Sequence, residues 1–299
     1  MSADFRQWEI EYGQTATAGT ATVTGVTSNL DCVGLGVDDH AGMDRLIGIA
    51  LESAESLGQA GGVSVLRWQD SSGARLIVGV RGDEVADLLP SYAGEPGARL
   101  ASVRAVNEDV VVADVVDEDG QQVTMLAAEL EQRRLLPAAG TVGGLACVVA
   151  LGVDVTVWAD EDAFAASDAS LLGDGDDPGE APAHVVEQGL SWPPRMAAES
   201  FISYGVFGDP EQVQAYARLN GTVLRAQRKA VAVTGQEFVV ARVRTAGFEV
   251  DVCLSADDVR ELPRPGNVIG GTMFLVASLP VVATTDRHAG KRSWLPWRR

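Results

Sequence analysis

The chain of 299 residues is 46% apolar and 22% charged, with a formal net charge of -19. This composition excludes disorder throughout the chain, because enough apolar surface is present to offset chain entropy, and the length allows two or three domains. No apolar run approaches the ~20 residues that cross a bilayer, and the N-terminal residues lack the order of a signal peptide. We therefore expect a cytoplasmic protein, and the strong preference for arginine over lysine is typical of GC-rich bacterial coding.

The charge is divided unevenly along the chain. Residues 1–216 hold 10 basic and 35 acidic side chains, a net charge of -25, whereas residues 217–299 hold 13 basic and 7 acidic side chains, a net charge of +6. Such asymmetry favours either contact between parts of the same chain or a separate anionic partner for the basic part.

The N-terminal region, residues 1–95, is predicted to be a small α+β domain with an antiparallel sheet. Its helix begins at Asp38 and Asp39, and apolar residues then recur at helical spacing as far as Leu57. The turn Asp70–Gly73 separates two alternating segments and so predicts a hairpin. In chain order we expect strands over 6–12 and 20–27, a helix over 38–57, strands over 63–69 and 74–81, and a helix over 83–89.

The sequence pattern changes at residue 96, where short strands separated by turn residues predict a small β-barrel. Residues 96–159 form this first repeat. An acidic and proline-rich linker follows over residues 160–199, and we expect little of it to pack. Residues 200–285 form a second, basic repeat, and residues 286–299 are a basic tail with tryptophans. Expected strands cover 100–106, 110–116, 122–126, 146–158, 221–233, 237–245, 248–254 and 273–279, with short helices over 127–135 and 210–218.

The two strand-rich segments resemble each other. Ala98-Arg99-Leu100 recurs 119 positions later as Ala217-Arg218-Leu219, and Pro137-x-x-Gly140-x-Val142-x-Gly144 recurs 126 positions later from Pro263. The expected order of three strands, a helix and a strand is that of the OB type of barrel, and SH3-like barrels share the pattern. The predicted fold class is therefore α+β and mainly β, an N-terminal antiparallel α/β unit followed by two similar, OB-like small barrels.

Motifs for catalysis or metal binding are weak. His40 follows two aspartates, but acids at a helix start satisfy free amide groups, which is the simpler interpretation. Asp174-x-Asp176-Asp177 lacks the later ligands of a calcium loop, and neither a phosphate-binding loop nor a Gly-x-Ser-x-Gly elbow is present. Three widely spaced cysteines provide no disulfide framework. Cys147 and Cys253 lie in apolar strands, where we expect inert, buried thiols. We expect no catalytic residue, metal or cofactor, although scattered carboxylates leave a hydrolase open as an alternative.

One group of residues suggests a binding surface. Basic side chains fall on two strands of the second repeat that we expect to be hairpin neighbours, and aromatic side chains lie close by. Arg242 and Arg244 are two residues apart and are therefore expected to share a face of their strand. Basic and aromatic residues return in the tail, and this combination is typical of surfaces that bind single-stranded nucleic acid. The candidate binding residues are Arg225, Arg228, Lys229, Phe238, Arg242, Arg244, Phe248, Trp294 and Trp297. The same charges fit docking on the acidic part of the chain, an anionic lipid surface, or plain solvated positions.

Together these features predict a non-enzymatic interaction protein whose partner is a protein, or whose basic part docks within the chain. The alternative is a protein that binds single-stranded nucleic acid through the basic second repeat, with residues 217–299 as the region that would contact it.

Overall fold

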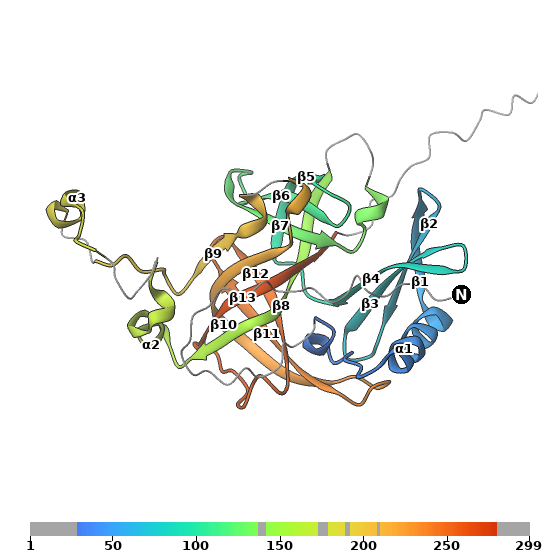
Figure 1. Cartoon of the computed structure of the whole chain (residues 1–299). Coiled ribbons are helices and arrows are strands. Elements are labelled where there is room, and N and C mark those ends of the chain that lie inside the picture. The colour runs from blue at the N-terminus through green and yellow to red at the C-terminus, as the bar shows by residue number, and fades with distance from the viewer. Residues whose placement is uncertain (1–28, 137–141, 173–178, 189–191, 208–209, 280–299) are drawn as a thin grey trace, which may run out of the picture.

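The computed structural model describes residues 29–136, 142–172, 179–188, 192–207 and 210–279. These residues form a sheet of four strands, a sheet of nine strands and three α-helices (Figure 1), which confirms the mainly β class. The predicted strands over 6–12 and 20–27 lie outside the described residues. The helices are α1 (His40–Ser53), α2 (Glu161–Ala166) and α3 (Ala183–Glu187). The strands are β1 (Glu55–Ala60), β2 (Val63–Gln69), β3 (Ala74–Arg81), β4 (Glu84–Tyr92), β5 (Ala98–Ala105), β6 (Val110–Val116), β7 (Gln122–Leu130), β8 (Val142–Trp158), β9 (Ser200–Ser203), β10 (Tyr216–Ala230), β11 (Glu237–Thr245), β12 (Phe248–Ser255) and β13 (Val268–Ser278).

The four-stranded sheet is an antiparallel meander in the order β1-β2-β3-β4, with α1 beside it (Figure 1). The predicted β2–β3 hairpin is confirmed, and Gly73 in its turn has a φ of 97°, a conformation that favours glycine. Leu46, Ile47 and Ala50 are the buried face of α1, and Leu46 and Ala50 belong to the same apolar core as Leu76 of β3.

The start of α1 is set by Asp39, whose carboxylate accepts a hydrogen bond of 2.6 Å from the amide of Gly42. Replacing Asp39 with alanine leaves this amide without its cap, so we expect the free energy of unfolding to fall by about 1 kcal/mol. Urea denaturation measures this loss of stability. Asp38→Ala is the control, because Asp38 precedes the capping residue. Equal losses in the two variants would contradict the assignment of the cap.

The predicted helix over 83–89 is wrong, because these residues belong to β4. Gly82, with a φ of 62°, turns the chain, and β4 then pairs antiparallel with β3, where Leu89 lies opposite Ile77. The acidic, leucine-containing segment has helical propensity, but burial of its second half against the neighbouring strand outweighs that weak preference.

The predicted helices over 127–135 and 210–218 are also wrong. β7 runs to Leu130 and only Arg133–Leu135 forms a 3₁₀ turn, while Pro210–Gln212 forms another before β10 begins. Ala127, Ala128 and Leu130 are fully buried in the sheet, so tertiary packing decides their conformation.

Strand pairing closes the nine-stranded sheet on itself. Its order is β11-β12-β8-β5-β6-β7-β13-β10-β9, and two additional pairings join β11 to β10 and β8 to β13. The pairings therefore complete two rings of five strands, β5-β6-β7-β13-β8 and β10-β11-β12-β8-β13. The two rings share β8 and β13, which pair antiparallel from Cys147–Ser278 to Trp158–Val268.

Each predicted repeat gives its last strand to both rings. β8 pairs antiparallel with β5 of its own repeat and parallel with β12 of the other repeat. In the same way, β13 pairs antiparallel with β10 and parallel with β7. Residues 96–159 and 200–279 thus contribute to one continuous sheet, and the predicted domain boundaries stay a prediction.

The expectation that little of residues 160–199 packs is wrong for part of this segment. Phe164 of α2 is fully buried and stacks edge-to-face on Trp158, with ring centroids 5.0 Å apart. Met196, Ala198 and Val268 complete this small core. α2 and α3 lie at the opposite end of the molecule from α1 (Figure 1).

Candidate partner-binding site

The predicted basic residues lie on the hairpin formed by β10 and β11. The two strands pair antiparallel, with Arg225 opposite Arg242, Arg228 opposite Val239 and Lys229 opposite Phe238. The prediction that these strands are hairpin neighbours is confirmed.

Arg242 is buried rather than available to a ligand. Its side chain is 3% exposed and makes a 2.9 Å ion pair with Asp251, itself 6% exposed. The same guanidinium donates hydrogen bonds to the backbone oxygens of Glu95 and Pro96. Arg242 therefore attaches the connection between the two sheets to β11, and a Cβ added to Gly97 of that connection would lie 2.2 Å from the Glu249 oxygen.

Burial raises the pKa of Asp251, and the positive charge of Arg242 acts in the opposite direction. A backbone amide, that of Glu95, also donates to this carboxylate at 2.9 Å. The pair is thus a structural element between β11, β12 and the connection that follows β4.

The remaining cations of the hairpin contact acidic or aromatic groups of the same chain. Arg225 pairs with Glu95 at 2.6 Å, Arg228 with Glu237 at 3.3 Å and Arg244 with Glu199 at 2.8 Å. Lys229 lies over the ring of Tyr92, 5.6 Å from its centroid. Hydrogen bonding from Arg244 lowers the pKa of Glu199.

The two predicted aromatic residues are buried. Phe238 is fully buried and contacts Tyr92 edge-to-face at 6.0 Å, and Phe248 packs edge-to-face on Phe201 at 5.1 Å. Neither ring presents a free face on which a base could stack in this conformation. Trp294 and Trp297 lie outside the described residues.

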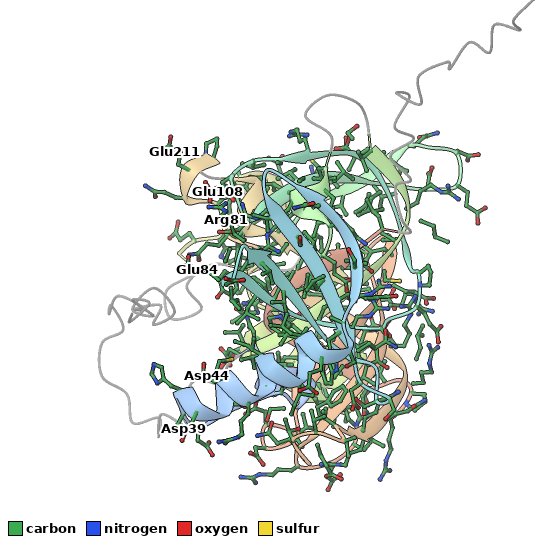
Figure 2. The ribbon with its side chains drawn as sticks, turned by 90° about the vertical axis from the view of Figure 1, so that its right-hand side faces the viewer. Asp39, Asp44, Arg81, Glu84, Glu108 and Glu211 are labelled. Atoms are coloured by element: carbon green, nitrogen blue, oxygen red, sulfur yellow. The ribbon has the colours of Figure 1, made fainter. Side chains whose placement is uncertain are left out.

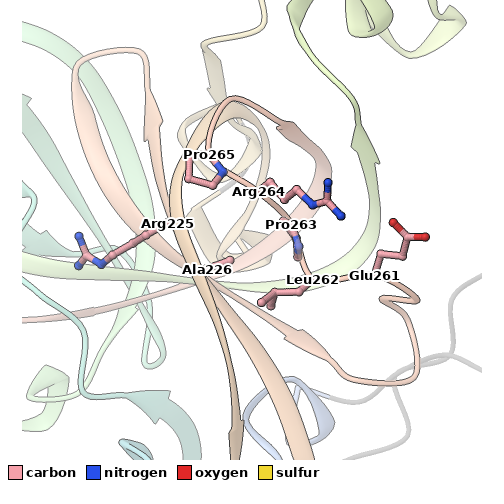
Figure 3. A pocket seen from close by; sticks show the side chains of 7 residues that line it. All are labelled: Arg225, Ala226, Glu261, Leu262, Pro263, Arg264 and Pro265. Atoms are coloured by element: carbon pink, nitrogen blue, oxygen red, sulfur yellow. The ribbon is translucent and has the colours of Figure 1, made fainter.

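A hollow of about 580 Å³ lies beside Arg225, between β10 and the loop that connects β12 to β13 (Figure 3). Ala226, Leu262, Pro263 and Pro265 supply its apolar wall, and Arg225, Glu261 and Arg264 supply its charged groups. Leu262 is 41% exposed. Among the described residues, no carboxylate lies within ion-pair distance of Arg264, whose guanidinium points away from β10 in Figure 3.

The wall of the hollow is held by backbone hydrogen bonds. Gly266 donates to the oxygen of Val223, and Val223 donates to the oxygen of Asn267. The Asn267 side chain accepts from the Arg264 amide at 2.7 Å and donates to the Ala159 oxygen at 2.8 Å. The β10–β11 register shifts between Val223 and Arg225, and such irregularities often redirect side chains next to sites.

Sequence reasoning identified Arg225 but missed the loop that completes the hollow. Pro263 and Gly266 were interpreted only as landmarks of the repeat. The signal was the Pro263-x-Pro265 spacing beside Leu262, but only the fold shows that this loop lies over β10.

The cysteines and the possible metal ligands are the remaining candidate groups. Burial raises the pKa of Cys32 to about 12 and that of Cys253 well above its usual range, so both thiols are protonated. The expectation that Cys147 is buried is wrong, because it is only partly buried; its thiol donates to the Gly94 oxygen. Within the described ranges, no three histidine, cysteine or acidic side chains are grouped to hold a metal ion.

No family model, curated protein or solved structure matches this chain. None of the helices in the described part of the chain is long and apolar enough to span a membrane.

Proposed function

We propose that the chain is a non-enzymatic interaction protein of the cytoplasm that binds a segment of a partner protein in the hollow between β10 and residues 261–265. The observation that carries this proposal is an apolar wall beside Arg264, a residue with no carboxylate within ion-pair distance in the part of the chain that the structure describes. The volume falls in the range of roughly 300–1,000 Å³ that is usual for ligand sites. Three cysteines without disulfides support a reducing compartment.

The lining favours a protein segment over single-stranded nucleic acid. An apolar side chain of the partner fits against Leu262 and Pro265, and a neighbouring carboxylate fits Arg264. Single-strand binding needs exposed aromatic faces, whereas Phe238 and Phe248 are buried and the cations of the hairpin contact their own chain. Two fixed prolines in the wall reduce the ordering cost of binding.

We also propose that the nine-stranded sheet consists of two similar barrels. Each five-stranded ring is a small β-barrel, the two barrels are copies of one OB-like unit, and the hollow lies at the mouth of the second barrel. The parallel and antiparallel pairings of β8 and β13, which correspond between the repeats, support this interpretation. Barrel mouths are frequent binding sites.

Selection of a random phage-displayed peptide library on the full chain tests the function. We expect enrichment of peptides that combine an apolar residue with Asp or Glu, and a loss of binding of about tenfold or more in Leu262→Asp and Arg264→Glu. Losses of this size correspond to about 1.4 kcal/mol. Arg260→Glu is the matched control, because it changes the same charge in the same loop outside the lining of the hollow.

Two outcomes would overturn the proposal. One is equal binding of the selected peptides by Arg264→Glu, Leu262→Asp and the unmodified chain. The other is binding of single-stranded oligothymidylate that weakens with salt while no peptide is enriched, which would favour nucleic acid instead.

A further inference from the structure

A cluster of six charged side chains joins the two sheets away from the hollow. It lies where β7 ends and the 3₁₀ turn Arg133–Leu135 begins, against β4 of the four-stranded sheet. The members are Asp87 of β4, Glu108 and Asp109 of the β5–β6 turn, Glu129 of β7, and Arg133 and Arg134. Figure 2 shows Glu108 toward the same end of the molecule as Arg81 and Glu84 of the four-stranded sheet.

Arg133 is the centre of this cluster, and its side chain is 4% exposed. Its Nη2 lies 2.5 Å from both carboxylate oxygens of Asp87 and 3.5 Å from Glu129 Oε2. Its Nε is 3.8 Å from Asp109 and has no hydrogen-bond partner within the described residues. One guanidinium thus bridges the four-stranded sheet, through Asp87, and the nine-stranded sheet, through Glu129.

Negative charge exceeds positive charge here when all groups are ionised. Four carboxylates face two guanidinium groups, and Arg134 lies 3.8 Å from Asp87 and 3.9 Å from Glu108. The strand neighbours of Glu129 on β6 and β13 are Val110 and Val276, which carry no charge. Glu129 therefore adds a partly buried negative charge beside Asp87 and competes with it for Arg133.

Burial is the main cause that raises the pKa of Glu129 to about 7. Asp109 and Asp87 raise this pKa further, whereas Arg133 and Arg134 lower it. Burial also raises the pKa of Asp87, and Arg133 opposes that shift. The pKa of Glu129 in the folded chain thus lies close to neutral pH, where a small change of pH alters the charge of this carboxyl group.

We infer that Glu129 is a pH-sensitive element of the contact between the two sheets: when it is neutral, Arg133 holds Asp87 and the four-stranded sheet is attached firmly, and when it ionises the attachment weakens. The direction follows from linkage. A carboxylate that binds its proton more tightly in the attached state stabilises that state at low pH, and this contribution is lost as pH rises through the higher pKa. The inference concerns a different part of the molecule from the hollow.

Hydrogen–deuterium exchange of the full chain at pH 6 and pH 8, corrected for intrinsic exchange, tests this inference. Between these pH values the equilibrium constant for opening of β3 and β4 is expected to rise about tenfold. This is the change expected for a carboxyl group whose pKa is about 7 when the sheets are attached and close to its ordinary value when they are detached. Glu129→Gln should abolish this dependence and give protection at least as high as that of the unmodified chain at pH 6, because a neutral side chain does not favour the detached state by ionising. Glu118→Gln, which changes an exposed residue of the same sheet, should behave like the unmodified chain.

Exchange in Glu129→Gln that depends on pH as strongly as in the unmodified chain would overturn the inference. A second measurement does not depend on a variant: the ¹³C carboxyl signal of Glu129 should titrate near pH 7, together with the Arg133 Nε signal. A midpoint for Glu129 below pH 5 would equally overturn it.

Discussion

Replacing Arg242 with alanine is expected to lower the free energy of unfolding by about 3–5 kcal/mol, because the buried carboxylate of Asp251 loses the guanidinium with which it pairs. Asp251 would keep its amide donor from Glu95, but the backbone oxygens of Glu95 and Pro96 would lose theirs. Guanidinium denaturation measures the loss. Since Asp251 can then take up a proton, the loss should be smaller at pH 5 than at pH 8.

Arg244 on the same strand is the matched control. It lies two residues further along β11 and also forms an ion pair, with Glu199, but its side chain is 55% exposed. Exposed pairs contribute little, because water and salt screen them. Arg244→Ala should therefore change stability far less than Arg242→Ala. Equal losses in the two variants would show that burial of the Arg242–Asp251 pair is not what makes it important.

Replacing Glu131 with alanine is expected to cost about 3 kcal/mol of stability and to loosen the four-stranded sheet, because a fully buried carboxylate joins the two sheets. Its Oε1 accepts hydrogen bonds from Ser91 at 2.6 Å and Arg75 at 3.2 Å, and its Oε2 lies 3.6 Å from Arg67. Denaturation and hydrogen exchange of β2–β4 measure the effect.

Glu131→Gln separates charge from hydrogen bonding in the same contact. The amide oxygen retains the acceptor for Ser91 but not the charge for the two arginines, so we expect a smaller loss than with alanine. Glu118→Ala removes an exposed carboxylate of the same sheet and is the control. A loss for Glu131→Ala no greater than for Glu118→Ala would contradict the assigned role.

Local patterns in the sequence were sufficient for the elements that depend on near neighbours. The β2–β3 hairpin follows from its own turn, and α1 begins at its own capping residue Asp39. The segment over 127–135 depends instead on a distant strand, because the end of β7 pairs with β13, more than 140 residues away in the sequence. The segment over 83–89 pairs with the neighbouring strand β3, but the burial that decides its conformation comes from the packed sheet and not from its own pattern. Propensity and spacing carry no information about such partners.

Local sequence patterns were also insufficient to predict the roles of single residues in the candidate site. Arg242 and Arg244 were placed on one face of one strand, and this is consistent with the register of β11 opposite β12. Their chemical roles differ because residues 95–97, far away in the sequence, cover Arg242 and leave Arg244 in solvent. Similarly, Leu262 and Arg264 become part of a hollow only when their loop lies over β10.

The sharing of β8 and β13 between the two rings has a consequence for synthesis of the chain. The first ring cannot close when β7 leaves the ribosome, because two of its members are missing: β8 follows directly, but β13 ends only at Ser278. About 150 further residues must be made, which takes roughly 10–30 seconds at common elongation rates. During this interval β7 is paired with β6 on one side only, because its other neighbour, β13, has not been made. We therefore expect chains that end before β13 to aggregate more readily than the full chain, because this strand edge stays unpaired.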